Sequence, residues 1–281
     1  MTYSKHTFDV LSISNNKYKN IEFLGEGSQA TVYVAHATKT NEKVAIKIFD
    51  ENNFTCLREV RILKHMQKLN LKHSLKYIES FTEKGMLLVA TEFVKGIELH
   101  DYALDGRIAS TTELHAIFRR ILIAANELHE NNICHLDFKL ENIIINPKSG
   151  EIKVIDFGFA EILGEGKNID KFRGSIHYSA PEIITNTPYD GKKADIWSLG
   201  VLFYLLVCHQ FPFPGLNETE PADGVPSKED MDEVAKQILT NDYSFTEQFS
   251  AQEKQMIIAM LNPDAHRRLS AKFLLQHLLP L

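Results

Sequence analysis

Hydrophobic positions in the N-terminal third of the chain fall into short clusters that are rich in β-branched and aromatic residues and are separated by turn residues. Such clusters predict strands, here at residues 21–25, 30–38, 42–49 and 85–94. Residues 54–69 differ, because their apolar positions recur at helical spacing, namely Leu57, Val60, Leu63 and Met66. The pattern predicts a β-rich N-terminal part that contains one helix.

After Gly96 the hydrophobic period becomes that of helices. Residues 110–132 begin with a Ser/Thr cap signal, and their apolar residues at helical spacing are Leu114, Ile117, Ile121 and Leu128. Further helices are predicted at residues 194–209, 228–240, 250–261 and 270–279. A small β-rich part followed by a larger helical part predicts an α+β fold with two cores and a cleft between them, where loops from both parts meet.

Composition and charge narrow the class of protein. The 281 residues carry a formal net charge of −6, which argues against non-specific binding of nucleic acid because such binding needs a basic face. The three cysteines form no CxxC pair, which indicates reduced thiols and no zinc site.

No segment predicts export or membrane insertion. The N-terminus lacks the apolar core of a signal peptide and the glycine after Met1 that myristoylation requires. The longest apolar run, residues 199–208, reaches half of the ~20 residues that a membrane span needs, so it predicts a buried core helix. We therefore expect a soluble, cytoplasmic protein.

One loop is unusual in composition. Residues 211–233 hold four prolines, two glycines and a cluster of acidic residues. Either a solvated surface insert or a docking site would have this composition.

Two glycines stand at a predicted turn between strands. Gly25 and Gly27, followed by Ala30, form the pattern GxGxxA, which a plain hairpin explains equally well. A dinucleotide-binding turn would require a helix to follow, whereas residues 31–35 predict a strand. A glycine hairpin of this kind can lie over a phosphate chain and offer it backbone N–H groups.

Charged and polar residues then occur at strand and helix positions. A lysine on a strand, such as Lys47, is usually solvated, but Glu59 in the predicted helix offers a partner that would hold it while it binds an anion. The segment HLDFKLEN, residues 135–142, offers Asp137 as a base, Lys139 as a cation and Asn142 as a metal ligand.

A second oxygen ligand follows an apolar strand. Asp156 precedes Phe-Gly, which a simple turn would also explain. Together with Asn142 it offers two oxygen atoms, and oxygen ligands with phosphate suit magnesium.

These motifs together resemble a eukaryotic-type protein kinase. From about Tyr18 to the C-terminus the order is GxGxxA, VAIK, a helix glutamate, HxDxKxxN, DFG, APE, DIWSLG and a late arginine. The resemblance implies a bilobal fold with an N-terminal extension at residues 1–17 and a kinase domain at 18–281. The β-rich N-lobe would cover residues 18–95 and the helical C-lobe 96–281, with the ATP cleft between them.

The same resemblance assigns residues to ATP and Mg²⁺. Lys47, held by Glu59, would contact the α- and β-phosphates of ATP, while Asn142 and Asp156 would hold Mg²⁺. Gly25 and Gly27 would lie over the phosphates, Val32, Ala45, Ile144 and the hinge Glu92–Val94 at the adenine, Thr91 behind it and Glu98 near the ribose. Leu24 and Glu26 are further residues expected around the nucleotide.

The resemblance also concerns the acceptor, a Ser or Thr hydroxyl of a protein substrate. Asp137 would orient this hydroxyl and accept its proton, and Lys139 would steady the γ-phosphoryl group. Lys139 and Ser175 are typical of serine/threonine kinases, in which this serine hydroxyl bonds the catalytic Asp and Lys. Glu98 and Glu141 resemble acids that recognise basic residues upstream of the target, although ordinary surface acids are an equal alternative.

Leu136 stands where the family commonly has an arginine that binds a phosphate on the activation loop. A leucine cannot form that charge-assisted pair. Residues 159–174 contain no Ser, Thr or Tyr, so the phosphate acceptor is absent together with its receptor. We therefore expect activity without phosphorylation of this stretch, and little cost from Ala30 in place of a third glycine.

Two other functions compete with an active kinase. A pseudokinase scaffold that binds nucleotide would be favoured if Lys47, Asp137 or Asp156 were replaced, and a small-molecule phosphotransferase would lack APE and the late helices.

Residues 174–213 most resemble the calmodulin-dependent and AMP-activated group of kinases. Control by a regulatory partner, the N-terminal extension or the acidic loop is expected. Arg268 is expected to pair with Glu182 in a structural role.

Overall fold

The computed structural model describes residues 17–26, 30–49, 55–83, 85–164, 166–216 and 227–277. Predictions that concern the N-terminal extension up to residue 16, Gly27, residues 217–226 of the acidic loop and the end of the last helix lie outside these residues. The chain divides into two compact units, the first with residues up to Asn70 and Leu75–Val94, the second with Leu71–Ser74 and the residues from Lys95 onward.

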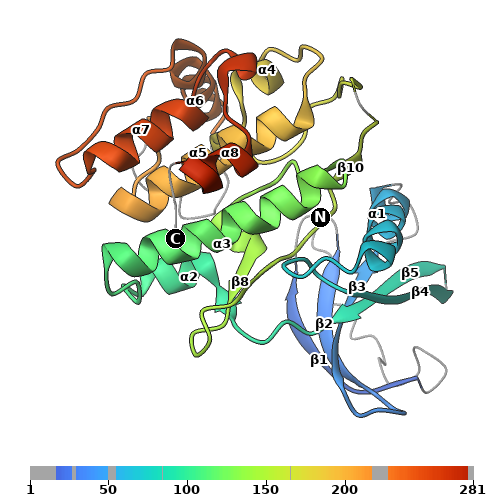
Figure 1. Cartoon of the computed structure of the whole chain (residues 1–281). Helices are drawn as coiled ribbons and strands as arrows, with labels where there is room; N and C mark the ends of the chain where they lie inside the picture. Colours follow the sequence, from blue (N-terminus) through green and yellow to red (C-terminus); the bar gives the residue numbers. More distant parts are fainter. Residues whose placement is uncertain are drawn as a thin grey trace. The chain divides into compact units, whose positions relative to one another are not determined.

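An antiparallel five-stranded sheet forms the first unit (Figure 1). Its strands are β1 (Tyr18–Glu26), β2 (Thr31–Ala37), β3 (Lys43–Phe49), β4 (Tyr77–Glu83) and β5 (Met86–Glu92), in the spatial order β1-β2-β3-β5-β4. The four predicted strands are confirmed as β1, β2, β3 and β5. The strand β4 is not among them, because its sequence YIESFTE alternates poorly and only Tyr77 is buried.

The helix α1 (Thr55–Leu69) packs against β4 in this unit. Val60, Leu63 and Met66 are buried as predicted, but the prediction for Leu57 is wrong, since 64% of this residue is exposed. A helix turns by about 100° per residue, so Leu57 and Met66, nine positions apart, point in opposite directions. The buried face begins at Cys56 instead.

Helices dominate the second unit. They are α2 (Leu99–Leu104), α3 (Thr111–Glu130), α4 (Pro181–Ile184), α5 (Gly191–Cys208), α6 (Lys228–Thr240), α7 (Ala251–Met260) and α8 (Ala271–His277), with 3₁₀ turns η2 (Leu140–Asn142), η3 (Ile176–Tyr178) and η4 (Ala265–Arg267). One small sheet joins β6 (Ile97–Glu98), β8 (Ile143–Ile145) and β9 (Ile152–Val154), and another joins β7 (Ile133–Cys134) and β10 (Glu161–Ile162).

The helices α3 and α5 form the centre of the second unit, where α3 packs on α8 and α5 packs on α7 (Figure 1). The predicted cap of α3 is confirmed, because the Ser110 side chain accepts a hydrogen bond from the Glu113 backbone N–H at 3.2 Å. The four apolar residues predicted for its buried face are all buried. Most of α5 is buried too, and within the described ranges no helix combines the length and apolar character that crossing a membrane requires.

The short segment Leu71–Ser74 belongs to the helical unit because of its bonds. The backbone N–H of Val154 donates to the His73 carbonyl at 2.8 Å, and the Lys153 ammonium donates to the Ser74 carbonyl at 3.1 Å. Glu127 of α3 also accepts from the His73 backbone at 3.2 Å. These bonds attach the segment to β9 and α3.

Candidate active site

The loop at residues 135–142 follows β7 directly and is held by α5. The fully buried carboxylate of Asp195 accepts from the backbone N–H of His135 at 2.9 Å and of Leu136 at 2.7 Å, and His129 contacts it at 2.9 Å. Leu136 has a φ of 64°, a left-handed conformation that costs a non-glycine residue about 1–2 kcal/mol. This role of Asp195 was not predicted from the sequence. A carboxylate inside an apolar helix is nevertheless a signal of a buried polar contact.

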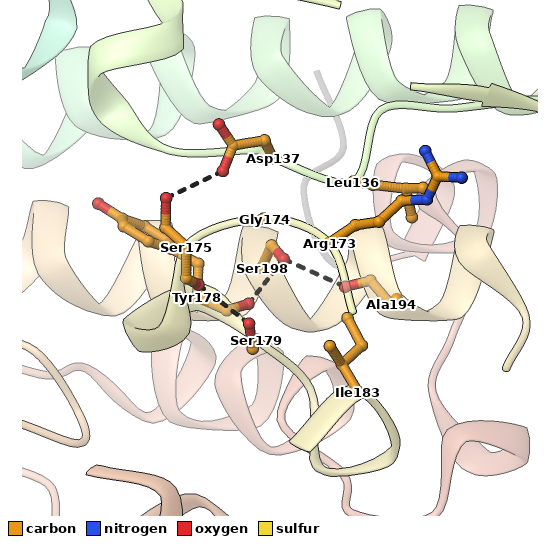
Figure 2. Close-up of a pocket in the computed structure, with 10 residues that line it drawn as sticks. All are labelled: Leu136, Asp137, Arg173, Gly174, Ser175, Tyr178, Ser179, Ile183, Ala194 and Ser198. Atoms are coloured by element: carbon orange, nitrogen blue, oxygen red, sulfur yellow. Dashed lines mark hydrogen bonds between the residues drawn. The ribbon is translucent and has the colours of Figure 1, made fainter. Parts of the chain in front are cut away.

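Asp137 lies among hydrogen-bond donors and is 4% exposed. Its Oδ2 accepts from the Asn142 amide at 2.8 Å and lies 3.2 Å from the ammonium of Lys139. Its Oδ1 accepts from the hydroxyl of Ser175 at 3.0 Å (Figure 2). The Lys139 ammonium in turn donates to the Ser175 oxygen at 3.2 Å, so the contacts predicted for Ser175 are confirmed.

This network has the chemistry to hold a hydroxyl group. The Ser175 hydroxyl donates to a carboxylate and accepts from an ammonium, both of which are charge-assisted hydrogen bonds. A second hydroxyl placed against Asp137 and Lys139 would meet the same two groups.

Two oxygen-bearing side chains flank the β8–β9 hairpin. Asn142 precedes β8, and the N–H of Ile155 donates to its carbonyl at 2.9 Å, which places Asp156 beside it. The Asp156 carboxylate accepts from the Gly158 N–H at 3.1 Å. In the described part of the chain no group of three or more His, Cys, Asp and Glu side chains is arranged to hold a metal ion. An amide oxygen and one carboxylate fit Mg²⁺, which completes its coordination with water and phosphate oxygens.

In the first unit, Lys47 of β3 is paired with Glu59 of α1, as predicted. The ammonium donates to both carboxylate oxygens, at 3.0 and 2.9 Å. The Glu59 side chain is 4% exposed and the Lys47 side chain 20%, so the carboxylate is shielded while part of the lysine side chain stays accessible. Such an ammonium is held in place and can still bind an anion.

Four residues expected near the nucleotide share one face of the sheet. Val32 lies opposite Lys47, and Ala45 lies opposite Thr91. Opposed residues share a face, as do alternate residues along a strand, so these side chains project to the same side. The residues of the other face form the buried cluster that includes Val44, Ile46, Leu88 and Ala90.

The glycine-rich end of β1 is described up to Glu26. Gly25 lies opposite Val32, and a Cβ atom at Gly25 would meet nothing within 4 Å. Leu24 is 54% exposed. The open space at Gly25 is compatible with a ligand, whereas Gly27 lies outside the described residues.

The expected hinge follows β5. Thr91 is buried, and the N–H of Glu92 donates to the Lys76 carbonyl at 2.9 Å. The Glu92 carboxylate accepts from the Lys76 N–H at 3.0 Å. The backbone N–H of Val94 makes no hydrogen bond with any described residue, so it is available as a donor to a ligand.

Acidic side chains gather near β6 in the second unit, where Glu98 lies opposite the half-buried Ile144. Burial raises the pKa of Glu98, and the negative charges of Asp101 and Glu141 raise it further. The buried Oε2 of Glu141 has no hydrogen-bond partner in the ranges that the structure describes. A cluster of this kind fits a cationic ligand, because a cation would satisfy the carboxylates.

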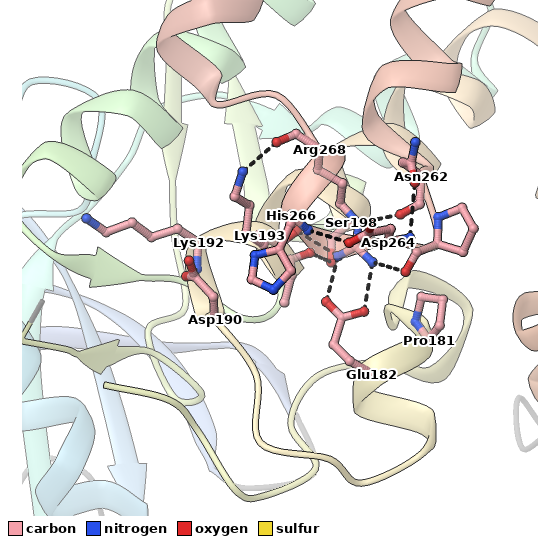
Figure 3. Close-up of polar contacts among 12 residues, drawn as sticks. Pro181, Glu182, Asp190, Lys192, Lys193, Ser198, Asn262, Asp264, His266 and Arg268 are labelled. Atoms are coloured by element: carbon pink, nitrogen blue, oxygen red, sulfur yellow. Dashed lines mark hydrogen bonds and ion pairs between the residues drawn. The ribbon is translucent and has the colours of Figure 1, made fainter. Parts of the chain in front are cut away.

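The predicted pair of Glu182 and Arg268 is confirmed (Figure 3). The buried guanidinium donates to both carboxylate oxygens, at 2.6 and 2.7 Å. It also donates to the carbonyls of Asn262 at 2.7 Å and Lys193 at 3.0 Å. Arg268 therefore links α4, α5 and the chain after α7 within the second unit, which is a structural role.

Comparisons with known proteins agree with this arrangement. The family model "Protein kinase domain" matches residues 18–279. Sperm motility kinase 3A of Mus musculus is 31% identical over 255 residues, which are 90% of this chain and 47% of that protein. Serine/threonine-protein kinase SIK2 of Gallus gallus is 37% identical over 200 residues, which are 69% and 25%. SNF-related serine/threonine-protein kinase of Homo sapiens is 32% identical over 261 residues, which are 90% and 32%.

The chain thus spans about half the length of the first relative and a quarter to a third of the other two. The relatives confirm the resemblance to serine/threonine kinases of the calmodulin-dependent and AMP-activated group. A sheet unit followed by a helical unit confirms the predicted α+β fold class. Since the family model matches almost every described residue, the chain belongs to the protein kinase domain family.

Proposed function

We propose that this chain is a Mg·ATP-dependent serine/threonine protein kinase that needs no phosphate on its activation segment, residues 156–182. The observation that carries the proposal is the Ser175 hydroxyl, which donates to Asp137 at 3.0 Å and accepts from Lys139 at 3.2 Å. The stretch before Ser175 has no phosphate acceptor from Phe159 to Gly174, and Leu136 carries no charge that would bind a phosphate.

Residues of both units bind the nucleotide in this proposal, with an N-lobe at residues 18–95 and a C-lobe at 96–281. Lys47, held by Glu59, binds the α- and β-phosphates, and Asn142 and Asp156 hold Mg²⁺. When bound, Mg²⁺ neutralises charge on the β- and γ-phosphates. Gly25 and Gly27 lie over the phosphates, and Val32, Ala45, Ile144 and the hinge Glu92–Val94 surround the adenine, with Thr91 behind it and Glu98 near the ribose. Leu24 and Glu26 complete the nucleotide-binding residues.

Asp137 and Lys139 act on the reacting groups. Asp137 orients the substrate hydroxyl and takes its proton as the hydroxyl oxygen attacks the γ-phosphorus. The bond from that phosphorus to the β–γ bridging oxygen breaks, and its electron pair leaves with ADP. Lys139 donates to the transferred group, so positioning and charge supply most of the acceleration.

Phosphatase treatment tests the proposal directly. Treated protein is expected to transfer labelled phosphate from ATP to a serine peptide at a rate within about twofold of untreated protein, because residues 159–174 contain no Ser, Thr or Tyr that could carry an activating phosphate. A phosphosite mapped to residues 156–182 whose removal stops transfer would refute the independence from phosphate. Tight Mg·ATP binding with no transfer would favour the pseudokinase scaffold instead.

The acidic cluster is expected to select substrates with a basic residue upstream of the acceptor. Glu141→Gln removes one charge-assisted bond, of about 1.5–3 kcal/mol, and should raise KM for such a peptide about tenfold or more. The KM for ATP and for a peptide with alanine at that place should stay unchanged. The exposed Glu247→Gln serves as the matched control. Equal KM changes for both peptides would contradict the assignment.

The same preference should depend on pH. Because the pKa of Glu98 is raised above its ordinary value of 4.5, its carboxylate attracts cations above the raised pKa and loses its charge as the pH falls through it. As the pH is lowered, the ratio of kcat/KM for the basic and alanine peptides should therefore start to fall at a higher pH than that at which ordinary carboxylates titrate.

We also infer a cytoplasmic location. Cys56, Cys134 and Cys208 are buried and form no disulfide, and burial raises the pKa of each thiol. Such thiols are unreactive and are typical of a reducing compartment. Control by a regulatory partner, by the N-terminal extension or by the acidic loop stays a prediction.

A further inference from the structure

The activation segment is closed by an ion pair within itself. Near its start, β10 is attached to β7, with Glu161 opposite Cys134. Near its end, the guanidinium of Arg173 lies 3.1 Å from the Glu161 carboxylate and donates to the Phe159 carbonyl at 3.3 Å. Arg173 therefore ties together two parts of the segment that are twelve residues apart.

This pair is shielded from water. The Arg173 side chain is 10% exposed and the Glu161 side chain 21%, whereas the surface pair Arg107–Asp105 is 50% and 52% exposed. Water screens an exposed pair, which consequently contributes little. Breaking a shielded pair leaves a charge that water solvates poorly. The free-energy cost of breaking it therefore stabilises this conformation of the segment.

Gly174 and Ser175, which follow Arg173, contact the catalytic loop, residues 135–142. Gly174 has a φ of 92°, and a Cβ atom there would lie 2.5 Å from the carbonyl oxygen of Leu136, so only glycine passes this close. Ser175 follows and contacts Asp137 and Lys139. Only Gly174, whose backbone lies against Leu136, therefore separates Arg173 from Ser175.

The space beside Leu136 has no room for a phosphate group. The cavity lined by Leu136, Arg173 and Gly174 has a volume of about 10 Å³, which corresponds to about one water molecule (Figure 2). Leu136 is apolar and 4% exposed, so the cation in this cavity lining is Arg173. The anion that Arg173 binds is a carboxylate of the chain itself.

We propose that the Arg173–Glu161 ion pair performs the positioning that phosphate-dependent kinases obtain from a phosphate on this segment. It holds Ser175 against Asp137 and Lys139, and this role rests on the proposed kinase function. Arg173 and Glu161 are positioning residues, because their contacts are with the segment and not with the reacting atoms.

A double-mutant cycle on kcat tests the pair. Arg173→Met and Glu161→Gln should each lower kcat about 10- to 30-fold while KM for ATP changes less than about twofold, since nucleotide contacts are kept. The double variant should be no slower than the slower single variant, because both changes break the same pair. Lys171→Met, which removes an exposed cation of the same segment, should stay within about twofold of the wild type.

Amide hydrogen exchange provides a readout that does not need catalysis. Exchange over residues 171–179 should be at least about tenfold faster in both single variants, whereas exchange in α3 and α5 stays as in the wild type. Single variants with wild-type kcat and exchange, or single effects that multiply in the double variant, would overturn the proposal. An inactive wild type whose exchange still depends on the pair would reject the kinase function and keep the positioning role.

Discussion

Asp137→Asn should lower kcat about 10²- to 10⁴-fold, the range that a positioned general base supplies. An asparagine cannot accept the proton of the substrate hydroxyl. It also places an amide where the carboxylate now accepts from Asn142 and Ser175, at 2.8 and 3.0 Å, so one donor would face another. Lys139 loses the partner that lies 3.2 Å away.

The measurement is single-turnover transfer of labelled phosphate, with Mg·ATP affinity determined separately. The nucleotide affinity should change little, because the phosphate contacts are assigned to other side chains. Asp242→Asn makes the same chemical change at an exposed position and should leave kcat unaltered. If Asp137→Asn kept more than about a tenth of the wild-type kcat, Asp137 would not be the base.

Arg268→Met should lower the free energy of unfolding of the second unit by about 3–5 kcal/mol, the usual cost of removing one partner of a buried ion pair. Arg268 has no exposed side-chain surface and Glu182 only 14%, so the remaining carboxylate would be poorly solvated. The carbonyls of Asn262 and Lys193 would also lose a donor. Methionine keeps much of the volume, so the loss reports on polar contacts more than on packing.

Chemical denaturation followed by tryptophan fluorescence measures this effect. Trp197 is the only tryptophan of the chain, and the Arg268 guanidinium lies 4.9 Å from its ring centroid, so the signal belongs to the second unit. The neighbouring Arg267→Met is the matched control, because Arg267 is 76% exposed and its pair with Asp264 should contribute less than about 1 kcal/mol. Similar losses of unfolding free energy in the two variants would show that the buried pair stabilises the unit no more than the exposed pair does.

Local sequence patterns predicted the long elements well. In α3 the cap at Ser110 and the buried residues from Leu114 to Leu128 depend on neighbours three or four positions away. Such neighbours can be recognised from the sequence alone. Leu57 and β4 show the limit of that reasoning. The burial of a single apolar residue depends on which element packs against it, and Leu57 lies on the side of α1 that stays exposed.

The charged pairs also divide into those that the sequence predicted and those that it did not. Those that belong to family motifs, Lys47 with Glu59 and Glu182 with Arg268, were predictable from the resemblance although the second pair is separated by 86 residues. Asp195 belongs to the motif DIWSLG, but its contact with residues 135 and 136 was not predicted, and the partner of Arg173 belongs to no motif recognised in the sequence. Both contacts depend on how the intervening chain reverses direction, which no spacing of residues reveals.

The sequence by itself determined the order of the long strands and helices apart from β4, the kinase motifs, and the absence both of a phosphate acceptor from residues 159–174 and of a phosphate-binding arginine from position 136. Only the tertiary structure decided that Arg173 turns toward Glu161 and that Asp195 holds the backbone of residues 135 and 136, and it supplied the distances of the expected contact between Ser175 and Asp137. The physical reason is that periodicity and capping act between near neighbours, whereas these bonds join residues between 12 and 59 positions apart and require the folded chain to bring them together.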